Sequence, residues 1–572
     1  MQKQWKIKEK ISDKIKNEFP EVNSIILQLL YNRGLTKQKD VDEFLNPDYG
    51  QDSHDPFLFK DMEKAVARIG QAIERDDKVL VYGDYDADGV CSSVVLYEIF
   101  KKLDLDVEVY LPHREKEGYG LNMKACDYII GQGVKLAVTV DCGISNKDEI
   151  KKLQDAGIDV IILDHHHPPA KLPKAYAIID AKVEGEIYPF KELAGVGVAF
   201  KFVQALVSKG KLKQGQEKWF LDLVALATVA DCCSLLGENR TLVKWGMVVL
   251  NKTKRLGLQE LIKAAGRELG KIDTYAIGYQ LAPRINAAGR MNHANGAFKL
   301  LISKNAAEAE KLALGLNKEN VERQKLTDRM VTEAKAQIEP FREEAKLIFV
   351  INPEKGDWPP GVVGLVAGKL CEQYHRPTLA LGRSEDGKLV GSGRSIDEFN
   401  IIKAVTEASE YLSHFGGHSG ACGFTIKSDG DTEPFKQKMI EIAESQLKDI
   451  EPSPVLEVDA QVGLREVSWE LFEQLENFEP FGDDNLKPRF LAKDLEVADF
   501  SAVGSDGKHM RLMLNQCEVK NRKTIGFGFG DWCGRLKVGD KVDMVFEVDV
   551  NEWNGNRELQ MKIVDMKLVT GH

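Results

Sequence analysis

Strand-like and helix-like stretches alternate between residues 78 and 179, and this alternation limits the possible folds more than any other feature. Helix-like stretches such as 91–103 and 146–157 separate short apolar runs. The β-rich runs are 78–82, 106–111, 135–140, 159–163 and 175–179. Alternation at this spacing is typical of βαβ units, so we predict a parallel sheet with helices on both faces.

Three of these runs end in carboxylates or imidazoles. The first runs into the loop GDYDADG, which holds Asp84, Asp86 and Asp88. The run 135–140 ends at Asp141, and the run 159–163 continues into DHHH at 164–167. Because ligands bind beyond the carboxyl ends of parallel strands, we expect these side chains to lie close together.

A fourth carboxylate, Asp231, follows the apolar stretch LDLVALATVA, where an unpaired charge would be costly. Singly, an aspartate after a strand is more often a turn former or a helix cap, and a histidine run is often a surface loop. Three such strand ends together with Asp231 favour a metal site. Oxygen ligands with one or two imidazoles favour Mn²⁺ or Mg²⁺ over zinc, and two such ions are typical of phosphoester cleavage.

The remaining sequence predicts further domains. Residues 1–60 indicate an N-terminal helical cap, followed by a catalytic α/β domain at 61–304. Near-helical spacing of apolar residues predicts one long connecting helix over 305–345 and then a smaller α/β domain at 346–450. Short alternating strands and an Asn-Gly hairpin signal predict a β-barrel, an OB-fold, at 451–572. The predicted fold class is therefore α/β with a C-terminal barrel.

Composition excludes several classes of protein. The 572 residues carry a formal net charge of −11, which argues against coating DNA by bulk electrostatics but is compatible with a local basic groove. No apolar run approaches the ~20 residues of a membrane span, and the charged N-terminus lacks a signal-peptide core. The nine cysteines form no C-x-x-C pair and indicate reduced thiols, so we expect a cytoplasmic protein without a zinc ribbon.

The strand-end motifs also resemble a known family. DYDADG, VDCGI, LDHHH and TVAD resemble motifs I to IV of the DHH phosphoesterase superfamily, and FGGHSGACGF resembles the GGH motif of its DHHA1 domain. The chain is similar over nearly its full length to the single-strand-specific 5′→3′ DNA exonucleases of that superfamily, including LPHREKEGYGL, APRINAAGRM, GSGRS and the terminal barrel. The resemblance implies a DHH domain joined by a long helix to a DHHA1 domain and an OB-fold. It also implies an enzyme that degrades single-stranded DNA to 5′-mononucleotides in DNA repair and recombination.

The resemblance implies particular site residues. Two Mn²⁺ or Mg²⁺ ions would be held by Asp86, Asp88, Asp141, His165 and Asp231, with Asp84 as an additional candidate ligand. Asp141 would bridge both ions, Asp164 would orient a histidine and His166 would touch the scissile phosphate. The substrate contacts would be Arg114, Arg284, Arg290, Ser392, Arg394, Gly416, Gly417 and His418. Trp553 would stack a base or pack on its own hairpin.

The resemblance also implies partners and shows departures from the family pattern. The partners would be single-stranded DNA with a 5′ end, a single-stranded-DNA-binding protein and a helicase, for a monomer that contacts no membrane. Tyr82 and Pro359 replace histidines that are frequent in the family. Cys232 and Cys233 replace a valine-proline run, and we expect them to serve packing.

Two alternatives stay open at this point. One is a DHH phosphodiesterase that acts on short oligoribonucleotides or cyclic dinucleotides, although such proteins usually lack the C-terminal barrel. The other is a non-catalytic DHH scaffold, although scaffolds of this kind have lost metal ligands that are present here.

Overall fold

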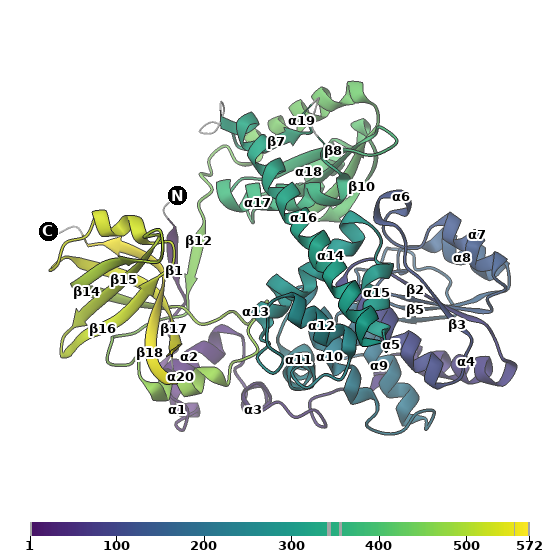
Figure 1. Ribbon diagram of the computed structural model, residues 1–572, viewed down its shortest axis with the longest axis horizontal. Coiled ribbons are helices and arrows are strands. Elements are labelled where there is room, and N and C mark those ends of the chain that lie inside the picture. Colours follow the sequence, from purple (N-terminus) through teal and green to yellow (C-terminus); the bar gives the residue numbers. More distant parts are fainter. Residues whose placement is uncertain (1–2, 340–344, 354–356, 554, 570–572) are drawn as a thin grey trace. The chain divides into compact units, whose positions relative to one another are not determined.

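The chain forms two compact units in a computed structural model that describes residues 3–339, 345–353, 357–553 and 555–569 (Figure 1). Unit 1 comprises Met1–Asp52, Ser234–Thr241 and Ser453–His572, and unit 2 comprises Ser53–Cys233 and Leu242–Pro452. Among the described residues, no helix has both the length and the apolar character of a membrane span.

Unit 2 contains the predicted parallel sheet, with strand order β3-β2-β4-β5-β6. The strands are β2 (Val79–Gly83), β3 (Val107–Tyr110), β4 (Leu136–Val140), β5 (Asp159–Leu163) and β6 (Ala177–Ile179). Every residue of β2 and β4 is buried, as expected for central strands covered on both faces. The parallel pairing brings the carboxyl ends of β2, β4 and β5 to one edge.

Helices cover both faces of this sheet. The helices α7 and α8 share an apolar core with one face, and α4, α5 and α9 contact the strands from the other. These five helices are α4 (Met62–Arg75), α5 (Ala87–Lys102), α7 (Met123–Gly131), α8 (Lys147–Asp155) and α9 (Gly195–Ser208). A helical layer follows: α10 (Leu221–Ala230), α11 (Gly237–Leu250), α12 (Leu256–Ala264), α13 (Thr274–Ala276), a π-helical turn (Ile277–Leu281), α14 (Ala282–Met291) and α15 (Asn295–Ile302).

The predicted connecting helix is α16 (Ala306–Ile338), whose 33 residues span about 50 Å. One part of α16 packs on α12, α14 and α15, and another part packs on α17 and β7. It leads to a mixed sheet with strand order β10-β11-β9-β8-β7. The elements are β7 (Ile348–Ile351), α17 (Pro360–Tyr374), β8 (Thr378–Arg383), β9 (Leu389–Arg394), α18 (Ile401–Glu407), β10 (Leu412–His418), β11 (Ala421–Ile426) and α19 (Thr432–Gln446).

Unit 1 contains the predicted barrel, closed by pairing of β14 with β17. Its elements are β13 (Ala460–Gln461), α20 (Trp469–Glu476), β14 (Phe490–Val503), β15 (His509–Gln516), β16 (Val519–Gly526), β17 (Lys541–Trp553) and β18 (Asn556–Leu568). The side chain of Trp553 lies outside the described residues, so its role in base stacking stays a prediction.

The N-terminal segment shares the apolar core of the barrel within unit 1. It contributes three helices as expected, but its first residues form a strand that pairs in parallel with the segment before the barrel. These elements are β1 (Gln4–Ile7), α1 (Asp13–Glu18), α2 (Ser24–Asn32), α3 (Gln38–Leu45) and β12 (Val455–Val458).

Candidate active site

The loop after β2 is fixed by hydrogen bonds to the starts of two helices. Asp86 caps α5, and its carboxylate accepts hydrogen bonds from the backbone N–H groups of Asp88 at 2.9 Å and Gly89 at 3.1 Å. The two carboxylate oxygens of Asp88 accept from the backbone N–H groups of Gly195 at 2.7 Å and Val196 at 2.8 Å, at the start of α9. These anchors preorganise both carboxylates at the strand end.

Asp84 is buried in the same loop, and its Oδ1 atom has no hydrogen-bond partner. A Cβ atom at Gly89 would lie 2.5 Å from the backbone oxygen of Asp84, so glycine is required at position 89. A buried carboxylate oxygen without a donor is costly unless a cation reaches it.

Asp141 directly follows β4 and has a left-handed backbone with φ of 59°. Aspartate is one of the few residues that adopt this conformation readily. A Cβ atom at Gly195 would lie 2.8 Å from the Cβ of Asp141, so the close approach of α9 depends on a glycine.

Asp164 organises the loop that holds the three histidines. Its carboxylate accepts hydrogen bonds from the backbone N–H groups of Ile144 at 3.0 Å and His165 at 2.8 Å, and lies 2.7 Å from Nδ1 of His166. Asp164 therefore fixes the ring of His166 and the backbone at the start of this loop. His167 is exposed.

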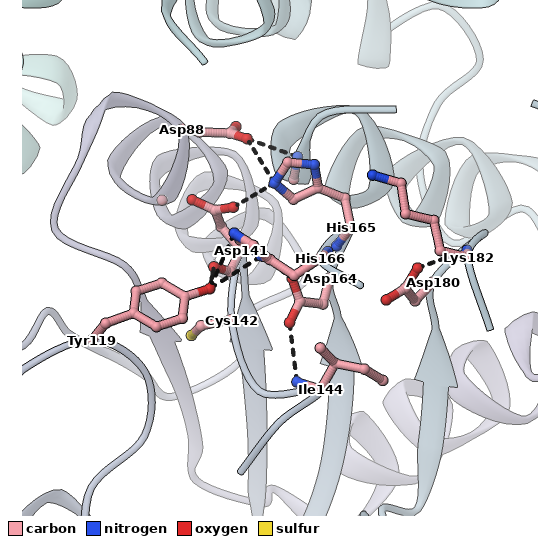
Figure 2. A network of polar contacts seen from close by, with 12 residues as sticks. Asp88, Tyr119, Asp141, Cys142, Ile144, Asp164, His165, His166, Asp180 and Lys182 are labelled. Atoms are coloured by element: carbon pink, nitrogen blue, oxygen red, sulfur yellow. Dashed lines mark hydrogen bonds and ion pairs between the residues drawn. The ribbon is translucent and has the colours of Figure 1, made fainter. Parts of the chain in front are cut away.

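His165 is directed toward the carboxylates, as Figure 2 shows. Its Nε2 atom lies 3.1 Å from Oδ1 of Asp141, 3.7 Å from Oδ2 of Asp231 and 4.0 Å from Oδ2 of Asp88. This Nε2 atom is buried and makes no hydrogen bond despite these short distances. Ligand atoms ~2.1 Å from a common ion lie about 3 Å apart, so the geometry fits a shared cation.

Three overlapping groups of side chains could hold a metal ion, each with its ligand atoms within 4.8 Å of one another. The groups are Asp84, Asp86 and Asp141; Asp141, His165 and His166; and His165, Asp231 and Cys233. Asp141 and His165 each belong to two groups. The donor set therefore fits two neighbouring ions, and the predicted ligands do converge.

We call Asp84, Asp86, Asp88, Asp141 and Asp231 the carboxylate cluster. Burial, reinforced by neighbouring carboxylates, raises the pKa of Asp88 to about 7 and of Asp231 to about 6, and it raises the pKa values of Asp84 and Asp141 well above their usual range. Burial lowers the pKa of His165, which favours the neutral imidazole that binds metals. Divalent cations would relieve the repulsion within the cluster.

His166 forms a chain with Asp164 and Tyr119. The Tyr119 hydroxyl lies 3.1 Å from Nδ1 of His166 and donates to the backbone oxygen of Asp141 at 3.2 Å. Burial lowers the pKa of His166, but the hydrogen bond to Asp164 outweighs it and raises the pKa to about 9. The same contact holds the pKa of Asp164 at about 2 although burial opposes it. The contact with Asp164 therefore favours the protonated imidazole of His166, a form suited to a phosphate oxygen.

Four arginines form a second cluster, which we call the arginine cluster: Arg114, Arg290, Arg323 and Arg394. Burial, together with the positive charges of the other three, lowers the pKa of Arg290 to about 9. None of the four forms an ion pair within 4.0 Å in the described part of the chain. Their few anchors include Arg290 Nη1 to the backbone oxygen of Gly361 at 3.0 Å and Arg394 Nη1 to Ser392 Oγ at 3.1 Å. Such a cluster attracts anions, and the guanidinium fork suits phosphate.

The predicted substrate residue Arg284 has a different environment. Its Nε atom donates to Asn317 Oδ1 at 3.0 Å, and its Nη1 atom donates to the backbone oxygen of Gln280 at 2.6 Å. The guanidinium of Arg284 is therefore already engaged by hydrogen bonds to α16 and to the turn before α14.

The GGH motif lies on the edge strand β10, in register with β11 and β9. One row joins Gly416, Gly423 and Ser392, and the row two residues further along joins His418, Ala421 and Arg394. A Cβ atom at Gly416 would meet nothing within 4 Å, so the backbone there is open. Gly417 has φ of +148°, and a Cβ atom would lie 2.3 Å from the backbone oxygen of Ala421. The motif thus presents uncovered backbone beside Ser392 and Arg394.

The two departures from the family pattern have structural explanations. Tyr82 is fully buried, and its hydroxyl donates to the backbone oxygen of Gly120 at 2.8 Å, so it packs within the domain. Pro359 precedes α17 and lines a cavity of about 680 Å³ together with Glu115 and Arg383.

Several residues beside the site carry no sequence motif, including Tyr119, Asp180 and Arg323. Asp180 follows β6, is buried, and has a pKa raised to about 7 by burial. Asp141 was predicted because it follows a strand of the parallel sheet, and Asp180 follows the strand β6 in the same way. Cys233, which we expected to serve packing, also donates a hydrogen bond from Sγ to Oδ2 of Asp231 at 3.2 Å.

The parallel sheet, the strand-end carboxylates and the GGH sheet define a phosphoesterase of the DHH class. The model of the DHH family N-terminal domain matches residues 78–228, and that of the DHHA1 domain matches residues 345–449. The RecJ OB domain matches residues 458–565.

Named proteins that are similar to this chain identify its family within the DHH class. The single-stranded-DNA-specific exonuclease RecJ of Bacillus subtilis (strain 168) is 39% identical over 564 residues, which cover 98% of this chain and 70% of that protein. RecJ of Thermus thermophilus is 30% identical, over 94% of this chain and 74% of its own. The crystal structure of Thermus thermophilus RecJ in complex with Mn²⁺ matches with a TM-score of 0.83 at 27% identity, covering 99% of this chain and 79% of that one. This chain belongs to the RecJ family of exonucleases.

Proposed function

We propose that the chain is a metal-dependent exonuclease that removes 5′-mononucleotides from the 5′ end of single-stranded DNA. Two observations carry the proposal. The predicted metal ligands converge on Asp141 and His165, and the backbone N–H of Ala87, beside Asp86, donates at 2.8 Å to Asn286 of α14, the helix that holds Arg290. A phosphodiester needs both features, because cations and guanidinium groups together neutralise the charge that develops on phosphorus oxygens.

The carboxylate cluster and His165 would hold two Mn²⁺ or Mg²⁺ ions. Such ions supply Lewis-acid activation of water and of the phosphate. Solved RecJ structures of Thermus thermophilus contain Mn²⁺ or Mg²⁺, and the oxygen-rich donor set here suits both ions. Asp88 and Asp86 keep their places through backbone hydrogen bonds, so they need little rearrangement on binding.

His166 and the arginines would bind the substrate. His166, held as a cation by Asp164, donates to an oxygen of the scissile phosphate, and Tyr119 limits the rotation of its ring. Arg290 and Arg323 bind the adjacent backbone phosphates. Arg284 is the less favoured candidate for this contact because its guanidinium is already engaged.

The 5′-terminal phosphate would bind beside the GGH sheet and set the polarity of cleavage. The contacts are Arg114, Ser392, Arg394, Gly416, Gly417 and His418. The guanidinium of Arg114 lies 4.7 Å from the ring centroid of Tyr85, next to the metal-binding loop. A terminal phosphate offers one more charge than an internal one, so these groups favour a 5′ end over continuous strand.

The barrel of unit 1 would guide the single strand. Phe527 is 56% exposed, its ring centroid lies 5.3 Å from that of His509, and Lys562 Nζ lies 5.9 Å from it. An exposed ring beside a cation is suited to base stacking and backbone binding. Trp553 remains a second candidate for stacking.

The cellular setting follows from the same proposal. The enzyme would act as a monomer in DNA repair and recombination, with a single-stranded-DNA-binding protein and a helicase as partners. Its nine cysteines form no C-x-x-C pair, which fits reduced thiols in the cytoplasm.

The test uses 5′-phosphorylated single-stranded DNA labelled at either end, with Mn²⁺ and the full chain. We expect labelled mononucleotide to appear at once from the 5′ label and only at the end of digestion from the 3′ label. Intact long DNA with cleaved dinucleotides would instead support a phosphodiesterase of short oligonucleotides. No cleavage of either substrate, with Mn²⁺ bound, would support a scaffold.

A further inference from the structure

The C-terminal end of α10 directs a cysteine at the metal centre. Cys232 has a left-handed backbone with φ of 54°, its N–H donates to the backbone oxygen of Val229 at 3.3 Å, and the N–H of Cys233 donates to that of Thr228 at 3.2 Å. These two bonds form a Schellman turn. The turn brings the side chain of Cys233 back onto Asp231, the last residue of the helix end, with Sγ 3.2 Å from Oδ2.

A second observation concerns His165, which points to the same place. The Sγ atom of Cys233 lies within 4.8 Å of ligand atoms of both His165 and Asp231. The His165 side chain is only 11% exposed, and its buried Nε2 atom makes no hydrogen bond although Asp231 Oδ2 lies 3.7 Å away. An imidazole nitrogen, a carboxylate oxygen and a sulfur that converge in this way form a donor set typical of zinc rather than of magnesium.

We propose that Cys233 is a ligand of the ion that His165 and Asp231 hold, and that this position selects a thiophilic divalent ion such as Zn²⁺ over Mg²⁺. The inference rests on the metal centre of the proposed function and adds its ion selectivity. Thiolate ligation releases the thiol proton to bulk water as the ion binds. Zn²⁺ bound there competes with Mn²⁺ or Mg²⁺ for His165 and Asp231, so the centre responds to the supply of zinc.

The test uses Co²⁺ as a spectroscopic probe and Zn²⁺ as its competitor, with the metal-free full chain. We expect Co²⁺ to produce a thiolate-to-metal charge-transfer band in the near ultraviolet. The band disappears in Cys233→Ser and persists in Cys232→Ser, the matched control on the neighbouring residue. Displacement of Co²⁺ gives a Zn²⁺ affinity that falls by about 10- to 100-fold in Cys233→Ser, whereas Mg²⁺ affinity changes by less than about threefold.

Two outcomes overturn the inference: no charge-transfer band in the wild type, or an unchanged band in Cys233→Ser. Circular dichroism shows whether each variant is folded. Asp141→Asn separates this inference from the metal centre itself. If Asp141→Asn binds Mn²⁺ as tightly as the wild type, the proposed metal centre fails; if Mn²⁺ binding needs Asp141 and Co²⁺ gives no band, only the role of Cys233 fails.

Discussion

The carboxylate cluster and the arginine cluster each gather like charges, but they are built in different ways. Asp84, Asp88 and Asp141 are buried, whereas the four arginines are half-buried. Two of the carboxylates are held by backbone N–H groups at helix starts, and Asp141 is held by the backbone conformation that follows a strand. The arginines come from separate elements: Arg290 from α14, Arg323 from α16, Arg394 from β9, and Arg114 from the start of the short helix α6 (Arg114–Glu117).

Burial shifts pKa values in opposite directions in the two clusters. It raises the pKa of Asp88 to about 7 and lowers the pKa of Arg290 to about 9. Each cluster is therefore unfavourable alone, and a phosphate with divalent cations stabilises both. Local backbone geometry builds the first cluster, and tertiary packing builds the second, so substitutions should affect them differently.

Asp141→Asn should give the largest effect, because Asp141 belongs to two of the three ligand groups. We expect the rate of nucleotide release with Mn²⁺ to fall by about 10³-fold or more. Asp273→Asn is the matched control, since asparagine replaces aspartate well at the N-cap of α13. Calorimetric titration should show the loss of Mn²⁺ binding in Asp141→Asn alone. Equal rates in the two variants would contradict the proposed metal centre.

Arg290→Met should reduce kcat/KM on single-stranded DNA by about 100-fold, because a charge-assisted contact to phosphate is lost. The melting temperature of the free protein should stay the same or rise, because the change removes a buried charge without a counter-ion. Arg376→Gln, which removes an arginine paired with Glu451, is the control. A large loss of stability in Arg290→Met would show that Arg290 serves packing.

Arg323→Gln should lower kcat/KM by about 10-fold, since Arg323 lies at the margin of the arginine cluster and is anchored to Asn320 at 2.9 Å. Arg329→Gln, on the exposed side of the same helix, should change it by less than about twofold. Salt dependence shows whether Arg323 contacts DNA or acts only through the fold. Loss of a phosphate contact reduces the slope of log K against log salt by about one. An unchanged slope would argue against DNA contact by Arg323.

Raising the pH should destabilise the metal-free protein. The pKa of Asp88 is about 7 and that of Asp231 about 6 when folded, against 3.8 for an ordinary aspartate. At a pH between the unfolded and the folded pKa values, the folded state binds more protons than the unfolded state. The free energy of unfolding therefore falls as the pH rises from about 4 to 7. We expect the melting temperature to drop by about 2–4 °C between pH 5 and 8, and saturating Mn²⁺ to abolish the drop. Asp88→Asn should show a smaller drop, and a rise in the metal-free protein would contradict the shifts.

Much of the fold and of the carboxylate cluster could be predicted from sequence, because strand ends in a parallel sheet share one edge. Asp84, Asp141 and Asp164 follow from that rule, and Asp180 would have followed from it too. The contact of Tyr119 with His166 and the effect of the Arg323 charge on Arg290 join residues far apart in the chain. Their packing depends on the positions of whole helices and loops, and no local pattern encodes it.

Cys233 shows a different limit of prediction from sequence. Its sequence context suggested packing, because two adjacent cysteines after an apolar helix carry no ligand spacing. Its direction depends on the left-handed backbone of Cys232, a conformation usually taken by glycine at this place in a helix end. A cysteine at position 232 does not indicate a left-handed turn at the end of α10.

The left-handed backbone at Asp141 also limits how the centre could be transplanted into another protein. Residues other than glycine, asparagine and aspartate would add about 1–2 kcal/mol of strain there, and of these three only aspartate offers an anionic oxygen. A designer who grafts the ligands onto a different parallel sheet must therefore copy this turn together with the glycine that faces it, Gly195. Grafting the side chains alone would leave the shared carboxylate misdirected.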